Sequence, residues 1–118
     1  MKQQELEDHL ARYPEIKLSV TGRKSGKTIS IPVWFVLEGN KLYLLPVRGS
    51  DTQWYRNVLT KPEIRIDARG TEASLKVKPI TESRAVESII ERFRHKYGAG
   101  DVKKYYAKFD VAVEAQME

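Results

Sequence analysis

Apolar side chains recur along this chain with two periods, which separate the expected helices from the expected strands. Spacings of three and four residues predict helices over 1–14, 50–59 and 83–97. Helical character extends to residue 107, so we expect a helical segment over 83–107 that is interrupted at Gly98. Alternating or β-branched runs predict six strands, over residues 16–20, 28–37, 41–47, 63–67, 73–80 and 109–114.

Turn and cap signals mark where these elements begin and end. Gly39-Asn40 separates two apolar runs and predicts a two-residue hairpin with glycine first. Arg69-Gly70 predicts a second hairpin turn. Ser50 and Gln53 have the spacing of a capping box, so a helix is expected to begin there, and Pro14 closes the N-terminal helix.

The order of these elements predicts a mainly β fold with flanking helices. No repeat and no low-complexity linker divides the chain, so we expect one domain over residues 1–118. Closing six antiparallel strands into a barrel buries their apolar faces and removes the exposed edges of the sheet. A six-stranded antiparallel barrel is therefore the expected architecture.

Composition narrows the classes of function. None of the 118 residues is cysteine, which excludes disulfides, thiolate metal sites and cysteine nucleophiles. The longest apolar run, residues 31–37, is too short to cross a bilayer, and residues 1–15 lack the apolar core of a secretory signal. We therefore expect a cytoplasmic protein without a transmembrane segment. The formal net charge of +5, from 21 Lys and Arg against 16 Asp and Glu, favours an anionic partner.

A basic, glycine-containing loop connects the first two expected strands. Residues 21–28 read Thr-Gly-Arg-Lys-Ser-Gly-Lys-Thr, and residues 16–35 contain no acidic residue. The glycines allow amide groups to converge on an anion, while Arg23, Lys24 and Ser25 supply charge and hydrogen bonds. The loop is one residue short of a P-loop and leads into a strand rather than a helix, which excludes a nucleoside triphosphatase.

A second candidate anion site precedes the expected helix over 50–59. Arg48 stands before the amides of Gly49 and Ser50, where a helix start carries a partial positive charge. Trp54 and Asn57, three residues apart, share one face of that helix. This combination of cations and a flat aromatic ring suits a phosphorylated aromatic ligand.

The chain offers few groups for catalysis without a cofactor. Its two histidines, His9 and His95, lie on expected amphipathic helices, and no metal-ligand spacing occurs. No serine stands in a nucleophile elbow. If the protein is an enzyme, we expect a cofactor to carry the reaction.

Several motifs together resemble the deazaflavin-dependent nitroreductase family, which belongs to the flavin-binding split β-barrels with the pyridoxamine-phosphate-oxidase-like proteins. The motifs are Thr21-Gly22-Arg23-Lys24-Ser25-Gly26, Pro32 in the second strand, the Gly39-Asn40 hairpin, Arg48-Gly49, Trp54-Tyr55-Arg56-Asn57 and Lys61-Pro62-Glu63. The resemblance covers residues 16–70, and the remainder agrees in element order. Two positions depart from the pattern, because Ile29 replaces a common arginine and Val47 a common small polar residue.

The resemblance implies an FMN-binding type of split β-barrel, a homodimer, and a bound 8-hydroxy-5-deazaflavin-type coenzyme or FMN. It places phosphate contacts on Lys24 and Arg48 and ring or tail contacts on Trp54 and Asn57. A family tyrosine cluster on the substrate side corresponds to Tyr105 or Tyr106.

The leading hypothesis is therefore an oxidoreductase that transfers hydride from the cofactor to a quinone- or nitroaromatic-like acceptor. Two alternatives remain open. One is a non-catalytic protein that binds flavin or another phosphorylated ligand, and the other is a small basic barrel that binds single-stranded nucleic acid. Against nucleic acid, the basic residues of 63–78 alternate with acidic ones instead of forming one stripe.

Overall fold

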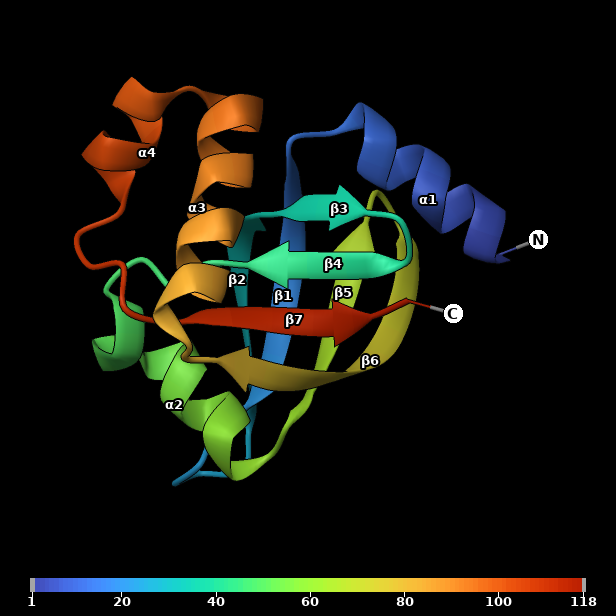
Figure 1. Cartoon of the computed structure of the whole chain (residues 1–118). Helices are drawn as coiled ribbons and strands as arrows, with labels where there is room; N and C mark the ends of the chain where they lie inside the picture. Colours follow the sequence, from blue (N-terminus) through green and yellow to red (C-terminus); the bar gives the residue numbers. More distant parts are fainter. Residues whose placement is uncertain (1, 118) are drawn as a thin grey trace.

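The computed structural model describes residues 2–117, which form a curved antiparallel sheet with helices around it (Figure 1). The strands are β1 (Glu15–Thr21), β2 (Thr28–Trp34), β3 (Val36–Glu38), β4 (Lys41–Leu44), β5 (Glu63–Ala68), β6 (Thr71–Ile80) and β7 (Ala112–Gln116). The helices are α1 (Lys2–Arg12), α2 (Gln53–Thr60), α3 (Ser83–Tyr97) and α4 (Ala99–Tyr105), and a 3₁₀ turn, η1, spans Gly49–Asp51. The predicted mainly β barrel with flanking helices is confirmed, with seven strands in the described residues rather than six.

The strand order is β2-β1-β5-β6-β7-β4-β3, and every neighbouring pair is antiparallel. The ten-residue strand β6 pairs with β5 through its first half and with β7 through its second half. It therefore bends from one layer of the barrel to the other, and β3, β4 and β7 cross in front of β1, β2 and β5 (Figure 1). The two end strands of the order, β2 and β3, are consecutive in the chain and separated only by Phe35.

This break at Phe35 is why one strand expected over 28–37 is two. The Tyr97 hydroxyl lies 3.1 Å from the Phe35 amide nitrogen and 2.9 Å from its carbonyl oxygen, and Lys96 Nζ donates to that carbonyl at 2.8 Å. Side chains from α3 thus replace the ladder hydrogen bonds that a continuous strand would make. The Phe35 ring is fully buried, so the chain passes from one layer to the other without exposing the core.

Other expected boundaries were also wrong, among them the end of the strand expected over 41–47, which covers Lys41–Leu44. The helix expected over 50–59 begins at Gln53, with Thr52 as its N-cap and no side-chain capping bond, so Ser50 and Gln53 do not form a capping box. The last strand, expected over 109–114, covers Ala112–Gln116. Between these elements, Ser50 lies in the 3₁₀ turn and its amide and hydroxyl donate hydrogen bonds to Asp110, which precedes β7.

The hairpins agree with the turn signals. Glu38 pairs with Lys41 across the Gly39-Asn40 turn, where Gly39 has φ 61°. The turn between β5 and β6 has positive φ at both Arg69 and Gly70, 55° and 90°, as a type I′ turn requires.

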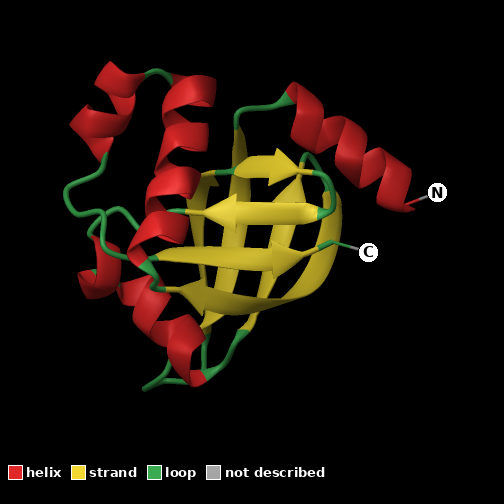
Figure 2. Ribbon diagram, in the orientation of Figure 1, coloured by secondary structure: helices red, strands yellow, loops and turns green. Residues whose placement is uncertain are grey.

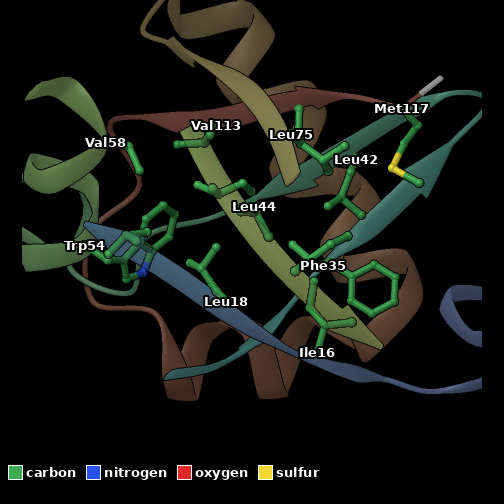
Figure 3. Close-up of a cluster of buried hydrophobic side chains, with 14 of the residues drawn as sticks. Ile16, Leu18, Phe35, Leu42, Leu44, Trp54, Val58, Leu75, Val113 and Met117 are labelled. Atoms are coloured by element: carbon green, nitrogen blue, oxygen red, sulfur yellow. The ribbon is translucent and has the colours of Figure 1, made fainter. Parts of the chain in front are cut away.

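The interior of the barrel is one apolar cluster drawn from both layers (Figure 3). Leu18 of β1, Leu42 and Leu44 of β4, and Val113 of β7 are fully buried there, and Trp54 from α2 closes one end. Leu6 and Leu10 of α1 pack on the same cluster, which joins the N-terminal helix to the barrel.

A second apolar cluster lies between α3 and the outer face of β3, β4 and β7. Tyr43 of β4 and Leu45, which follows the strand, alternate with Leu42 and Leu44. Residues 42–45 therefore contribute to both clusters and form a continuous apolar run. Phe93 is the fully buried centre of the α3 face. Figure 2 shows α2, α3 and α4 on one side of the strands and α1 apart from them.

Candidate functional site

Helix α2 is the centre of the candidate site, because both predicted anion loops and an aromatic cavity adjoin it. Trp54, Tyr55, Asn57 and Val58 are buried along one face of the helix. Residues with i, i+3 and i+4 spacing share a helix face, which directs Trp54 and Val58 into the barrel. Lys61 ends the helix, and Pro62 follows.

The basic loop between β1 and β2 is a compact turn fastened to α2. Within it, the Gly22 amide donates to the Lys27 carbonyl at 2.8 Å and the Gly26 amide donates to the Gly22 carbonyl at 2.9 Å. The buried Asn57 Oδ1 accepts hydrogen bonds from the backbone amide and the guanidinium of Arg23, at 3.1 and 2.8 Å. Arg23 also donates to the side chain of Gln53 at 2.8 Å. The loop is therefore held by Arg23, while Lys24, Ser25 and Lys27 remain exposed.

In the second loop, the backbone amide of Ser50 already donates a hydrogen bond within the protein. The Ser50 amide and hydroxyl donate to the two carboxylate oxygens of Asp110, at 2.9 and 2.5 Å. Gly49 is required here, because its φ is 53° and a Cβ would lie 2.0 Å from Asp110 Oδ1. The carboxylate of this chain thus fills the position at which the sequence places a phosphate beside Ser50. The Arg48 side chain is exposed, and its amide donates to Thr52 Oγ1 at 2.8 Å.

An exposed charge network surrounds that carboxylate. Lys108 Nζ lies 3.2 Å from Asp51 and 3.6 Å from Asp110, and Arg56 pairs with Asp51 at 3.0 Å. The Lys108 ammonium, followed by Arg56, lowers the pKa of Asp51. Partial burial by itself would raise the pKa of Asp110, but the hydrogen bonds from Ser50 and the charge of Lys108 outweigh it and lower that pKa.

An aromatic cavity of about 520 Å³ opens between β2, α2 and the end of α4. Trp34, Trp54, Tyr105 and Tyr106 supply four rings to its wall. The other lining residues are Glu15, Ile31, Pro32, Val33, Leu45, Val47 and Thr52. Glu15 is the one charged side chain in this lining.

The rings of the cavity meet at steep angles. Trp34 lies edge-on to Tyr105, with centroids 5.3 Å apart and planes at 75°, and is tilted by 58° against Tyr106. Behind Trp34, Tyr97 stacks at 4.2 Å with an interplanar angle of 7°. Burial raises the pKa of Tyr97 to about 12 and also raises the pKa of Tyr106, so both phenols keep their protons at neutral pH.

The structure brings part of the predicted site together. Trp54, Tyr105 and Tyr106 line one cavity, and Arg48 follows Val47, which lines it too. Asn57 contacts Arg23 of the basic loop and does not line the cavity. Lys24 and Ser25 lie on the exposed basic loop, outside the lining.

Sequence reasoning missed Glu15, and it named Trp34 only as one of six aromatic residues that could line or cover a ring system. Glu15 begins β1, and Trp34 ends the antiparallel partner β2, so the register pairs the two residues. Pairing the two predicted strands end to end would have placed them side by side. Neither Glu15 nor Trp34 belongs to a sequence motif that would have indicated the other residue.

A second groove lies between α1, β3 and α3, with a volume of about 720 Å³. Lys96 lines it, and its ammonium sits 3.6 Å from the Phe35 ring centroid while donating to the Phe35 carbonyl. Burial lowers the pKa of Lys96 to about 8.

Residues 2–117 contain neither a metal-binding cluster nor a membrane-spanning helix. No group of three or more His, Cys, Asp or Glu side chains in this range is arranged to hold a metal ion. In the same range, no helix is both long and apolar enough to cross a membrane.

Comparisons with known proteins identify the family and the fold. The chain belongs to the family described as "Uncharacterized protein conserved in bacteria (DUF2255)", whose sequence profile matches residues 7–116. A search of curated proteins found no match.

Solved structures with this fold have various functions. An F420-H2-dependent reductase, FDR-A, matches with a TM-score of 0.67 and 18% identity, over 87% of this chain and 94% of that protein. HutZ, a heme storage protein from Vibrio cholerae, matches with a TM-score of 0.72 and 13% identity, over 98% and 89%. A protein assigned as a pyridoxamine 5′-phosphate oxidase from Listeria innocua matches with a TM-score of 0.69 and 13% identity, over 100% and 94%. These matches show that the chain shares the fold of these proteins, in agreement with the fold that the resemblance implies.

Proposed function

We propose that this member of the family is a reductase that uses a bound deazaflavin or flavin to transfer hydride to a quinone- or nitroaromatic-like acceptor. The observation that carries the proposal is the aromatic cavity beside Arg48, in which four rings form the wall and exposed cations stand outside. The shared fold of two F420-dependent reductases supports it.

The described residues fit the two halves of such a cofactor. Neither Lys24 nor Arg48 forms an ion pair with another residue of 2–117, so both are available to an anionic phosphate or tail. Gly49 and Ser50 contribute the turn that carries Arg48, although the Ser50 amide is used by Asp110. Arg23 and Asn57 fasten the basic loop to α2 and thereby position Lys24, and the exposed Ser25 lies next to it.

The flat ring would lie against the aromatic wall, where Trp54 and Tyr105 exclude water from the reacting faces. When bound in its reduced form, the cofactor supplies the hydride. Tyr105, which is 53% exposed and lines the cavity, would donate a proton to the acceptor. Because burial raises the pKa of Tyr106, its phenol stays protonated and would donate a hydrogen bond to the same acceptor.

The charge distribution favours the deazaflavin over FMN. An acidic tail extends further than one phosphate and suits several cations, and the basic loop offers Lys24 and Lys27 in addition to Arg48. FMN is the alternative cofactor. We also propose that the protein acts as a homodimer, as supported by a structural neighbour described as a domain-swapped dimer.

The test is a fluorescence titration of the purified protein with FMN and with the deazaflavin, followed by turnover of the reduced cofactor with a panel of quinones and nitroaromatics. We expect a dissociation constant below about 100 μM, or roughly −5.5 kcal/mol, for one of the two. Failure of both to bind would remove the cofactor from the proposal.

Tight binding without turnover would favour the non-catalytic alternative. The existence of a heme storage protein with the same fold keeps this second function in view. Ion pairs such as Lys17–Asp67, Arg65–Glu72 and Lys78–Glu114 place acids beside the basic residues of the sheet, which disfavours a polyanion such as nucleic acid.

A further inference from the structure

We propose that the aromatic cavity binds the positively charged group of its ligand, an alkylammonium or a cationic aromatic group, with Glu15 as the counter-charge. The inference rests on the proposed function only in treating this ligand as the acceptor. The cavity itself is defined by its walls, whatever reaction takes place there.

The walls supply the faces that attract a cation. Trp34 and Tyr105 pack edge to face, with their planes at 75°, so they form a corner of the cavity wall in which a bound group would contact both rings. Trp54 and Tyr106 extend the wall from α2 and from the end of α4. Aromatic faces carry partial negative charge, and boxes of such rings are a means of binding quaternary ammonium groups.

The charge of the lining has one sign. Glu15 is its one charged residue, and within residues 2–117 no cation forms an ion pair with it. Its field reaches the neighbouring phenol, because its charge contributes to the raised pKa of Tyr97 after the larger effect of burial. A carboxylate at the edge of an apolar cavity attracts a cation and repels an anion.

One ring of the cavity wall, that of Tyr105, already contacts a cation of the protein. Lys104 Nζ lies 5.6 Å from the centroid of Tyr105 but does not line the cavity. Arg48 also stays outside. The positive side chains therefore lie outside the cavity, where they would meet an anionic tail, and the cavity wall would meet the uncharged ring of the cofactor and a neutral or cationic group of the acceptor. This division separates the two ligands by charge.

The test uses choline and its uncharged carbon isostere, 3,3-dimethylbutan-1-ol, which are both transparent where tryptophan absorbs. Each is titrated into the cofactor-free protein while the fluorescence of Trp34 and Trp54 is followed. We expect choline to bind about tenfold more tightly than the alcohol. Equal affinities, tighter binding of the alcohol, or no binding of choline would overturn the proposal.

Two pairs of variants assign the effect to residues. Glu15→Gln should remove most of the preference for choline, whereas Glu63→Gln, a matched change at the exposed start of β5, should leave it unchanged. Tyr105→Leu should weaken choline binding, and Tyr105→Phe, which retains the ring, should not. Because Glu15 and Tyr105 are both exposed, the variants are expected to fold. An unchanged preference in Glu15→Gln contradicts the role of the carboxylate.

The readout needs neither cofactor nor turnover. Failure of choline to bind, with intact binding of the deazaflavin or FMN, would reject this inference and leave the reductase proposal standing. Choline binding without any cofactor binding would do the reverse.

Discussion

The ring of Tyr97 stacks on the ring of Trp34, with centroids 4.2 Å apart and planes 7° from parallel. The same tyrosine places its hydroxyl 2.7 Å from the Pro14 carbonyl and within hydrogen-bond distance of both backbone groups of Phe35. The last residue of α3 therefore joins the beginning of β1, the break between β2 and β3, and the wall of the aromatic cavity.

Tyr97→Phe tests this junction, because it keeps the stacked ring and removes only the hydroxyl. Partly buried backbone groups of Phe35 would lose a partner, so we expect a loss of about 1–3 kcal/mol in the free energy of unfolding. Urea denaturation measures it. Tyr105→Phe is the control, because its ring is exposed, and a change of less than about 0.5 kcal/mol is expected. Equal effects of the two changes would contradict a junction at Tyr97.

Lys24→Ala and Arg48→Ala test the cationic part of the proposed cofactor site. Loss of one charge-assisted contact to phosphate should weaken cofactor binding by about 1.5–3 kcal/mol in each variant. Fluorescence titration of the cofactor gives the affinities. Lys76→Ala, an exposed change on β6, should leave them unaltered. If both Lys24→Ala and Arg48→Ala bind normally, the anion site lies elsewhere.

Asn57→Ala tests whether α2 holds the basic loop. The change leaves the amide and guanidinium of Arg23 without their shared acceptor, so we expect a loss of about 1–3 kcal/mol in the free energy of unfolding. Gln53→Ala removes only an exposed side-chain contact with Arg23 and should cost less. Chemical denaturation of the two variants under the same conditions compares their free energies of unfolding. A larger loss in Gln53→Ala would contradict the proposal that Asn57 holds the basic loop on α2.

The Asp110 carboxylate makes stability dependent on acid pH. Its pKa is lower in the folded protein than in the unfolded chain, so it stabilises the fold above pH ~4 and this contribution is lost as the pH falls through the folded value. Asp110→Asn should therefore reduce the slope of stability against pH below pH ~4. Asp101→Asn, an exposed change in the first turn of α4, is the control. Thermal unfolding between pH 2 and pH 6 provides the comparison, and parallel curves for wild type and Asp110→Asn would count against this assignment.

Lys96 also makes stability rise with pH, but it does so at alkaline pH, because burial disfavours its charged form in the folded protein. Burial lowers its pKa to about 8 in the folded protein, whereas the unfolded value is about 10.4, so between these values the unfolded chain binds more protons. The Lys96 contribution therefore makes stability rise with pH across this window. Lys96→Met should remove that rise, and Lys103→Met, on the exposed side of α4, should keep it. The midpoints of urea denaturation from pH 7 to pH 11 measure how stability changes with pH. A rise in stability that persists in Lys96→Met would show that Lys96 is not its cause.

The pattern along the chain was sufficient for most of the elements and their turns. Alternation over Glu63–Ala68 and the left-handed pair Arg69-Gly70 are local properties, because side-chain period and φ preference depend on neighbours in sequence. The stop of α3 at Gly98, with φ 96°, is local for the same reason. The positive charge of the basic loop is likewise evident from its amino-acid sequence.

Contacts between distant residues decided the rest. The strand break at Phe35 depends on Tyr97, 62 positions later, and the occupied amide at Ser50 depends on Asp110, 60 positions later. No local preference encodes either contact, because each is selected by the packing of a whole helix or strand. Sequence by itself thus determined the barrel and its candidate cations. Only the tertiary structure joined Glu15 to the aromatic wall and separated that wall from the cations, since folding places side chains by packing and not by their order in the chain.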